Sequence, residues 1–300
     1  MSALAQAATE YLELRRGAGF KLEGADKLLD EFSAYAEARG GRVTVELAME
    51  WATTKSSGRR GVARRLSVVR LFARYLQAVS ADHEVPPAGL VSARSSRAIP
   101  HLYSDAEVSA LMSVGQQLEP ALRGATTETV IGLLAATGMR IGEVLALDDT
   151  DIDWDRALLR IRLAKFDQER LVPLSPSTLS ALHRYQERRR ALCPAPSTGA
   201  LLVTEKGVRL GYLVFRKAFK ELSARVGLPG GARIHDLRHS FAVATLLEWY
   251  RQGLDVGALM PRLSVYLGHI DPAATYWYLT GSPELMALIA LRLEATEVAP

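Results

Sequence analysis

The chain has 300 residues, long enough for one large or two ordinary domains, and 48% hydrophobic with 23% charged residues is ordinary globular composition. This composition excludes a disordered or collagen-like chain, and the single cysteine, Cys193, excludes an intramolecular disulfide and a thiolate metal cluster. The net charge of +4 is too small to indicate a partner by itself, so the distribution of charge along the chain has to be examined.

The longest apolar runs, 130–139 and 285–291, are much shorter than the roughly 18 residues that cross a bilayer. The N-terminus lacks the basic start and apolar stretch of a signal peptide. We therefore expect a cytoplasmic protein with no membrane partner.

Residues 1–85 are predicted to form a helical domain, in which the helical spacing extends to about Ser80. The pattern predicts a helix pair over 3–39 with a break at 17–19, a helix that ends near Trp51, and a longer helix that opens at 58–61. On this longer helix an apolar stripe faces inward and arginines fill the other face. From Lys55 to Arg97 nine basic residues stand against two acidic ones, a net charge of +7. Such a segment fits nucleic-acid binding, but it also fits a solvated helix face.

Residues 86–102 contain three prolines and two serine-rich patches without periodicity, which is typical of an interdomain linker. A second domain, 103–300, begins with Ser104 as an N-cap. It is predicted to contain many helices and one hairpin, whose strands cover 158–163 and 170–174. The predicted fold class is therefore mainly α with a small antiparallel β-sheet (α+β).

Two motifs near the middle of the chain carry basic side chains. Arg140 lies where a buried helix ends at a glycine turn and the next helix begins, with Glu143 one turn further on the same face. Lys165 lies on the hairpin loop, from which a long side chain can reach across a surface. Taken alone, the first motif is better explained as a surface ion pair and the second as a solvated lysine.

A third motif places His235, Arg238 and His239 on one face at the start of a helix. Two histidines four residues apart, with an acid beside the first, also resemble the His-Glu-x-x-His pattern of zinc hydrolases. Arg238 on the same face would repel a dication, and the acid here is an aspartate. A metal site is therefore the less favoured interpretation.

The fourth motif is His269, at the end of a helix, followed nine residues later by Tyr278. In one unbroken helix this step would put the two side chains on opposite faces, so they converge only if the chain breaks at Pro272. The alternatives are an ordinary hydrogen-bonding histidine and, over 276–278, an aromatic stripe that packs the C-terminal helix.

In this order and at these spacings, the four motifs resemble those of the tyrosine recombinases, or phage integrase family, of the Xer and integrase type. The resemblance covers the whole chain and is strongest over 137–147 (TGMRIGEVLAL), 235–242 (HDLRHSFA) and 266–278 (YLGHIDPAATYWY). The catalytic residues that it implies are Arg140, Lys165, His235, Arg238, His269 and Tyr278.

The reaction implied is site-specific DNA recombination through a 3′-phosphotyrosyl intermediate, without a metal or cofactor. Tyr278 would attack the phosphodiester, His235 would accept its proton, and Lys165 would protonate the departing 5′-oxygen. A free phenol has a pKa of about 10, so the attacking hydroxyl needs such an acceptor.

The remaining residues of the set would hold the phosphate. Arg140 and Arg238 would bind its non-bridging oxygens, and His269 would donate a further hydrogen bond. Glu143 is interpreted as orienting Arg140, and His239 as a structural hydrogen-bonder.

The resemblance also implies that 1–85 is a DNA-binding domain and that the domains 1–85 and 103–300 clamp opposite sides of double-stranded DNA. An apolar C-terminal helix over 283–297 would dock on a neighbouring protomer, giving a homotetramer around two duplexes. Other candidates are a non-catalytic DNA-binding accessory factor of the same fold and a type IB topoisomerase or hairpin-telomere resolvase. The complete set of six residues disfavours the first, and the separate N-terminal domain and short length disfavour the others.

Overall fold

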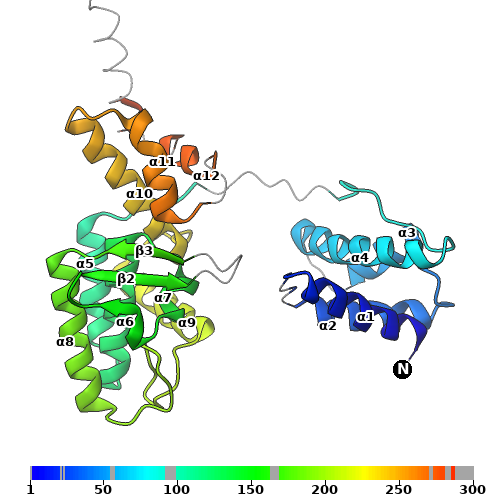
Figure 1. Cartoon of the computed structure of the whole chain (residues 1–300), viewed down its shortest axis with the longest axis horizontal. Coiled ribbons are helices and arrows are strands. Elements are labelled where there is room, and N and C mark those ends of the chain that lie inside the picture. Colours follow the sequence, from blue (N-terminus) through cyan, green and yellow to red (C-terminus); the bar gives the residue numbers. More distant parts are fainter. Residues whose placement is uncertain are drawn as a thin grey trace, which may run out of the picture. The chain divides into compact units, whose positions relative to one another are not determined.

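The computed structural model describes residues 2–20, 22, 24–54, 58–91, 99–162, 169–269, 273–280 and 285–287. The chain forms two compact units, 1–97 and 98–300, and the division between them falls inside the predicted linker (Figure 1). Among the described residues, none of the helices combines the length and the apolar character that crossing a membrane requires.

The first unit is a bundle of helices whose apolar faces share one core. The helices are α1 (Ala3–Gly17), α2 (Ala25–Glu37), α3 (Val45–Thr54) and α4 (Arg59–Val79). The predicted helix pair and the long arginine-bearing helix are thereby confirmed. The stripe of α4 that contains Leu66, Val69 and Phe72 is fully buried, as its spacing predicts.

One of the α4 arginines departs from the prediction that all of them lie on the outer face. Arg65 is only 8% exposed, and its guanidinium lies 3.7 Å from the ring centroid of Trp51. It donates to the Trp51 carbonyl at 3.1 Å and approaches Glu31 at 3.7 Å. The reason is that a guanidinium can be buried when it stacks on an indole and pairs through its terminal nitrogens, although Arg65 Nε has no hydrogen-bond partner among the described residues. Arg59, Arg64 and Arg74 are exposed as predicted.

The second unit is mostly helical. Its helices are α5 (Asp105–Gln116), α6 (Ala121–Thr137), α7 (Ile141–Ala146), α8 (Pro176–Leu192), α9 (Tyr212–Val226), α10 (Ile234–Arg251), α11 (Val256–Leu267) and α12 (Ala273–Tyr276), with the 3-10 turns η1 (Asp149–Asp151) and η2 (Trp277–Thr280). Ser104 begins α5 with a capping box, which confirms the predicted N-cap. Helix α6 contacts both α5 and α8 (Figure 1).

The sheet of this unit is antiparallel, in the order β1-β2-β3, with strands β1 (Ile152–Asp153), β2 (Leu158–Arg162) and β3 (Glu169–Pro173). The predicted hairpin and the predicted fold class are confirmed. In β2 and β3, Leu159 and its partner Val172 are buried together. Strand β1 escapes sequence prediction because two residues are too few to show an alternating pattern.

A separate apolar cluster joins α10 and α11 to the residues that follow them. It includes Tyr278 and Leu285, and Leu285 is fully buried. Of the predicted C-terminal helix 283–297, only 285–287 lie among the described residues, and they are helical. The apolar stripe of that segment therefore begins by packing on its own unit.

Candidate active site

Arg140 lies at the junction of α6 and α7. Helix α6 ends at Gly138, whose φ of 61° is left-handed, and a Cβ there would lie 2.4 Å from the ring of Phe241, so only glycine fits. Arg140 is the N-cap of α7: its backbone N–H donates to Glu143 Oε2 at 2.8 Å and its Nη1 donates to Oε1 at 2.9 Å. Its side chain remains 40% exposed, so a ligand can reach it.

Arg238 lies in the first turns of α10 and is only 1% exposed. Nη1 donates to the Gly138 carbonyl at 2.9 Å, and Nη2 donates to the Leu267 carbonyl and to His269 Nε2, both at 2.8 Å. Burial lowers the pKa of Arg238, and the nearby Tyr278 acts in the opposite direction. Since arginine starts far above neutral pH, the site retains a buried cation.

His269 follows α11, which ends at Gly268 with a left-handed φ of 67°. Its Nε2 is the acceptor from Arg238, because a guanidinium can only donate. The proton is then on Nδ1, which donates to Thr275 Oγ1 at 2.7 Å. Burial, Arg238 and Arg140 lower the pKa of His269 to about 4, so the ring is neutral at pH 7.

Tyr278 lies in η2, is 5% exposed and stacks on His269 with 5.9 Å between the ring centroids. The predicted convergence of His269 and Tyr278 is therefore confirmed, although Pro272 lies outside the described residues. Tyr276 is 52% exposed, so the aromatic stripe is not one packed face. Of the two tyrosines, Tyr278 belongs to the cluster around Arg238.

The two histidines of α10 differ in their surroundings. His235 is exposed, and partial desolvation and Arg238 lower its pKa. His239 is buried, and its ring meets the edge of Tyr278 at 4.8 Å between centroids. Its Nε2 has no hydrogen-bond partner within the part of the chain that is described, so the interpretation as a structural hydrogen-bonder is wrong for this atom.

His239 makes the stability of the second unit depend on pH. Burial lowers its pKa to about 4, against about 6.5 in an unfolded chain, so the unfolded state binds the proton first. The contribution of neutral His239 to the free energy of unfolding is complete above pH 6.5 and is lost as the pH falls toward 4. We expect the difference in unfolding free energy between pH 7 and pH 5 to be about 2 kcal/mol smaller in His239→Phe than in the wild type. Denaturant unfolding at both pH values checks this, and an unchanged difference would contradict it.

Lys165 lies outside the described residues, and the described chain stops at Arg162 and resumes at Glu169 on either side of it. Two residues that the sequence analysis missed contact the site: Thr275, which accepts from His269, and Arg170, which forms an ion pair with Glu143 at 2.8 Å. Arg170 shares the inner face of β3 with Val172, but a charged residue in a short strand is ordinarily expected to face solvent, and a threonine before an aromatic run gives no signal. Among the described residues, no three His, Cys, Asp or Glu side chains are grouped as metal ligands.

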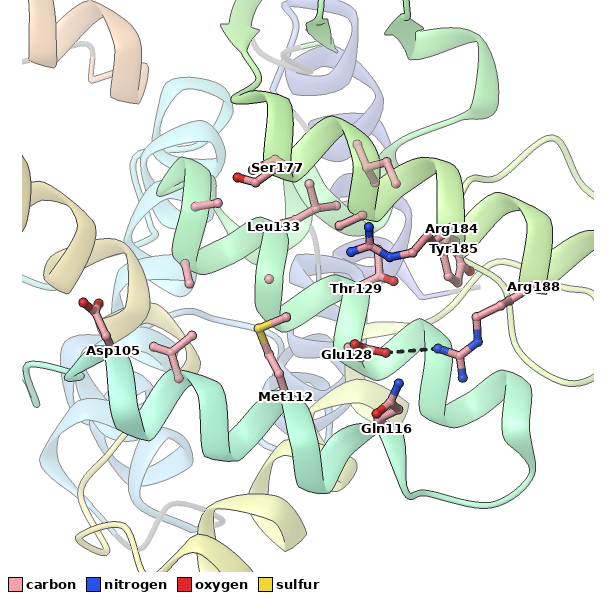
Figure 2. A pocket seen from close by; sticks show the side chains of 17 residues that line it. Asp105, Met112, Gln116, Glu128, Thr129, Leu133, Ser177, Arg184, Tyr185 and Arg188 are labelled. Atoms are coloured by element: carbon pink, nitrogen blue, oxygen red, sulfur yellow. Dashed lines mark hydrogen bonds and ion pairs between the residues drawn. The ribbon is translucent and has the colours of Figure 1, made fainter.

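A pocket of about 520 Å³ lies between α5, α6 and α8, away from these residues. Figure 2 shows Met112 and Leu133 at the pocket, with Arg188 directed toward Glu128 near Gln116. The Arg188 Nη1 to Glu128 Oε2 distance is 3.2 Å. None of the residues that the four motifs supply lines this pocket, so the candidate site is the cluster around Arg238.

Residues 103–284 match the model of the phage integrase family. A protein named as integrase/recombinase y4rB, from Sinorhizobium fredii, is 42% identical, with 98% of each chain covered. The tyrosine recombinase XerD of Lacticaseibacillus casei is 31% identical, over 72% of this chain and 71% of its own length.

Two solved structures share the fold. The Tn1549 transposon integrase in complex with transposon right end DNA has a TM-score of 0.67 at 17% identity and covers 100% of both chains. A lambda integrase tetramer bound to a Holliday junction has a TM-score of 0.61 at 14% identity and covers 92% of this chain and 76% of its own.

Proposed function

The chain belongs to the phage integrase family, and from this membership we propose a reaction in which Tyr278 attacks a DNA phosphodiester and remains attached to the 3′-phosphate. The protein is a tyrosine recombinase, an enzyme that breaks and rejoins DNA in site-specific recombination. The phosphotyrosyl bond conserves the energy of the broken bond, so rejoining needs no cofactor. The 5′-hydroxyl of a partner strand then attacks this bond and releases the tyrosine.

The observation that carries the proposal is the convergence of Arg140, Arg238, His269 and Tyr278 around the turn after α11. Arg140 Nη2 donates to the Gly268 carbonyl at 2.9 Å, and Arg238 donates to the Leu267 carbonyl next to it. Two guanidinium groups from distant parts of the sequence thus lie at the turn that carries His269, and Arg238 also interacts with Tyr278. A pentavalent phosphate carries its charge on non-bridging oxygens, which arginine forks bind strongly.

His269 has to exchange partners when it donates to the phosphate. Its Nε2 accepts from Arg238, and its pKa is low because of the surrounding cations. An anionic phosphate between Arg140 and Arg238 offsets those cations, which favours a protonated His269. Nε2 can then donate to a phosphate oxygen while Nδ1 keeps its bond to Thr275.

His235 and Lys165 are proposed as the proton carriers. The lowered pKa of His235 keeps the ring neutral at pH 7, which is the form that can accept the tyrosine proton. Lys165 is proposed to protonate the departing 5′-oxygen from the hairpin loop. Under this proposal the exposed His235 is the general base and Lys165 is the general acid.

Lys165→Ala tests the proposal on a duplex that carries the binding site, located by footprinting on DNA that flanks the coding sequence. We expect slow cleavage of the ordinary duplex and near wild-type cleavage of a duplex with a bridging 5′-phosphorothiolate, because a sulfur leaving group needs no proton. Single-turnover gels measure both rates. An equal defect on the two substrates would assign the acid role elsewhere, with His235 as the next candidate.

We propose further that double-stranded DNA binds to the arginine face of α4 in the first unit and to the catalytic domain in the second. We also propose that four protomers assemble on two DNA sites. The lambda integrase structure named above is a tetramer. The compartment proposed is the cytoplasm, which holds the DNA of the bacteria that these relatives come from.

The assembly is tested by a chain that stops after Ala287, which retains Tyr278 and the buried Leu285. The apolar residues that follow are proposed to dock on a neighbouring protomer. We expect unchanged binding to one half-site and loss of cooperative binding to paired sites, both measured by gel shift and native mass spectrometry. Wild-type assembly of the shortened chain would place the tail within its own protomer.

A further inference from the structure

Arg170 is the third arginine at the C-terminal turn of α11. Its Nε donates to the carbonyl of Tyr266 at 2.9 Å, while Arg238 and Arg140 engage the next two carbonyls. Three consecutive carbonyls, those of residues 266, 267 and 268, thus each accept from a different arginine. The last carbonyls of a helix lack intrahelical partners and carry partial negative charge, so they orient cations well.

Glu143 links Arg170 to Arg140. Nη1 and Nη2 of Arg170 donate to Oε1 and Oε2 of Glu143 at 2.9 and 2.8 Å, and both side chains are 9% exposed. The Arg140 guanidinium makes one bond to the same carboxylate. Although burial acts to raise the pKa of Glu143, the bonds from Arg170 and Arg140 lower it. Both arginines therefore bind the Glu143 carboxylate, and the Arg170 guanidinium makes two of these hydrogen bonds where the Arg140 guanidinium makes one.

Gly268 provides the space for this arrangement. A Cβ at this position would lie 3.1 Å from Arg170 Nη1 and 3.3 Å from its Cζ, so the guanidinium rests against the bare Cα. The left-handed φ of 67° independently favours glycine. Arg170 is thus fixed on three sides, by Glu143, by the Tyr266 carbonyl and by the turn that carries His269.

We infer that Arg170 is a positioning residue for strand cleavage. It binds the Glu143 carboxylate, so that the Arg140 guanidinium is available to phosphate. It also fixes the turn before His269. The inference rests on the proposed function. Without Arg170, the Glu143 carboxylate loses two bonds and keeps those from Arg140, so its negative charge competes more strongly with the phosphate for the Arg140 guanidinium.

The first test is Arg170→Met, assayed by single-turnover cleavage and by half-site affinity. We expect the cleavage rate to fall about 10- to 100-fold, as for other misplaced catalytic groups, and the affinity to change about 2-fold or less. Arg162→Met is the matched control. Arg162 lies on the same hairpin but is paired with Asp148 and Asp151, so its loss should leave the rate unchanged.

The decisive variant is the double change Glu143→Gln with Arg170→Met. Since the glutamine carries no charge to compete for Arg140, we expect the double variant to cleave several-fold faster than Arg170→Met alone. A purely structural role predicts the opposite, because the second change removes a further buried interaction. Should thermal unfolding show that Arg170→Met does not fold, the same comparison is made between Arg170→Lys and its double variant with Glu143→Gln.

The outcomes separate this inference from the proposed function. If the wild type forms no covalent adduct, the proposed function fails. If the wild type forms the adduct and Arg170→Met cleaves at the wild-type rate, or the double variant is no faster than the single one, only the positioning role of Arg170 is overturned.

Discussion

Tyr278→Phe is expected to bind its DNA site with wild-type affinity and to form no covalent adduct. The change removes one hydroxyl, and the phenyl ring retains the packing against His239 and His269. Since the hydroxyl oxygen is the atom that forms the new bond to phosphorus, its loss removes the reaction rather than slowing it. A duplex nicked near the crossover traps the adduct of the wild type, and the assay is run in EDTA because the proposed reaction uses no metal.

Tyr276→Phe is the matched control, because Tyr276 is two residues away and 52% exposed. It should form the adduct at the wild-type rate. Peptide mapping of the wild-type adduct by mass spectrometry should place the phosphate on Tyr278. An adduct on Tyr276 would require that α12 and η2 rearrange on DNA, and it would refute the assignment of the nucleophile.

Arg140→Ala and Arg238→Ala are each expected to lower the cleavage rate about 100-fold or more, the usual effect of removing one preorganised donor from a transition state. DNA affinity should change far less, because many phosphate contacts along the duplex contribute to it. Single-turnover rates and gel-shift titrations measure the two quantities separately. A normal cleavage rate would remove the substituted arginine from the proposed catalytic set.

The two arginine variants differ in their effect on the fold. Arg238 also bonds the Gly138 and Leu267 carbonyls from a buried position, so Arg238→Ala should lower the unfolding temperature as well. Arg140 is 40% exposed, which makes its alanine variant the cleaner test of chemistry. Arg225→Ala, which removes an exposed arginine paired with Glu221, controls for the loss of one positive charge.

The sequence predicts those parts of the fold and of the site whose residue pattern lies within a short segment of the chain. Helical spacing locates α4, the capping residue Ser104 locates the start of α5, and motif order identifies the side chains that meet around Arg238. Arg170 is missed because its partners, Glu143 and the Tyr266 carbonyl, are distant in sequence. The burial of Arg65 is missed because stacking on Trp51 depends on the packing of two helices.

The hydrogen bonds of three arginines to the carbonyls at the end of α11 also have a consequence for the chain during its synthesis. Arg140, Arg170 and Arg238 leave the ribosome before the carbonyls of 266–268 that orient them, and Tyr278 emerges last. A nascent chain therefore carries basic side chains that can attract nucleic acid, but it has neither an oriented phosphate clamp nor a nucleophile. Under the proposed roles, a chain that is still being translated cannot form the phosphotyrosyl bond until the turn after α11 and the segment with Tyr278 have emerged.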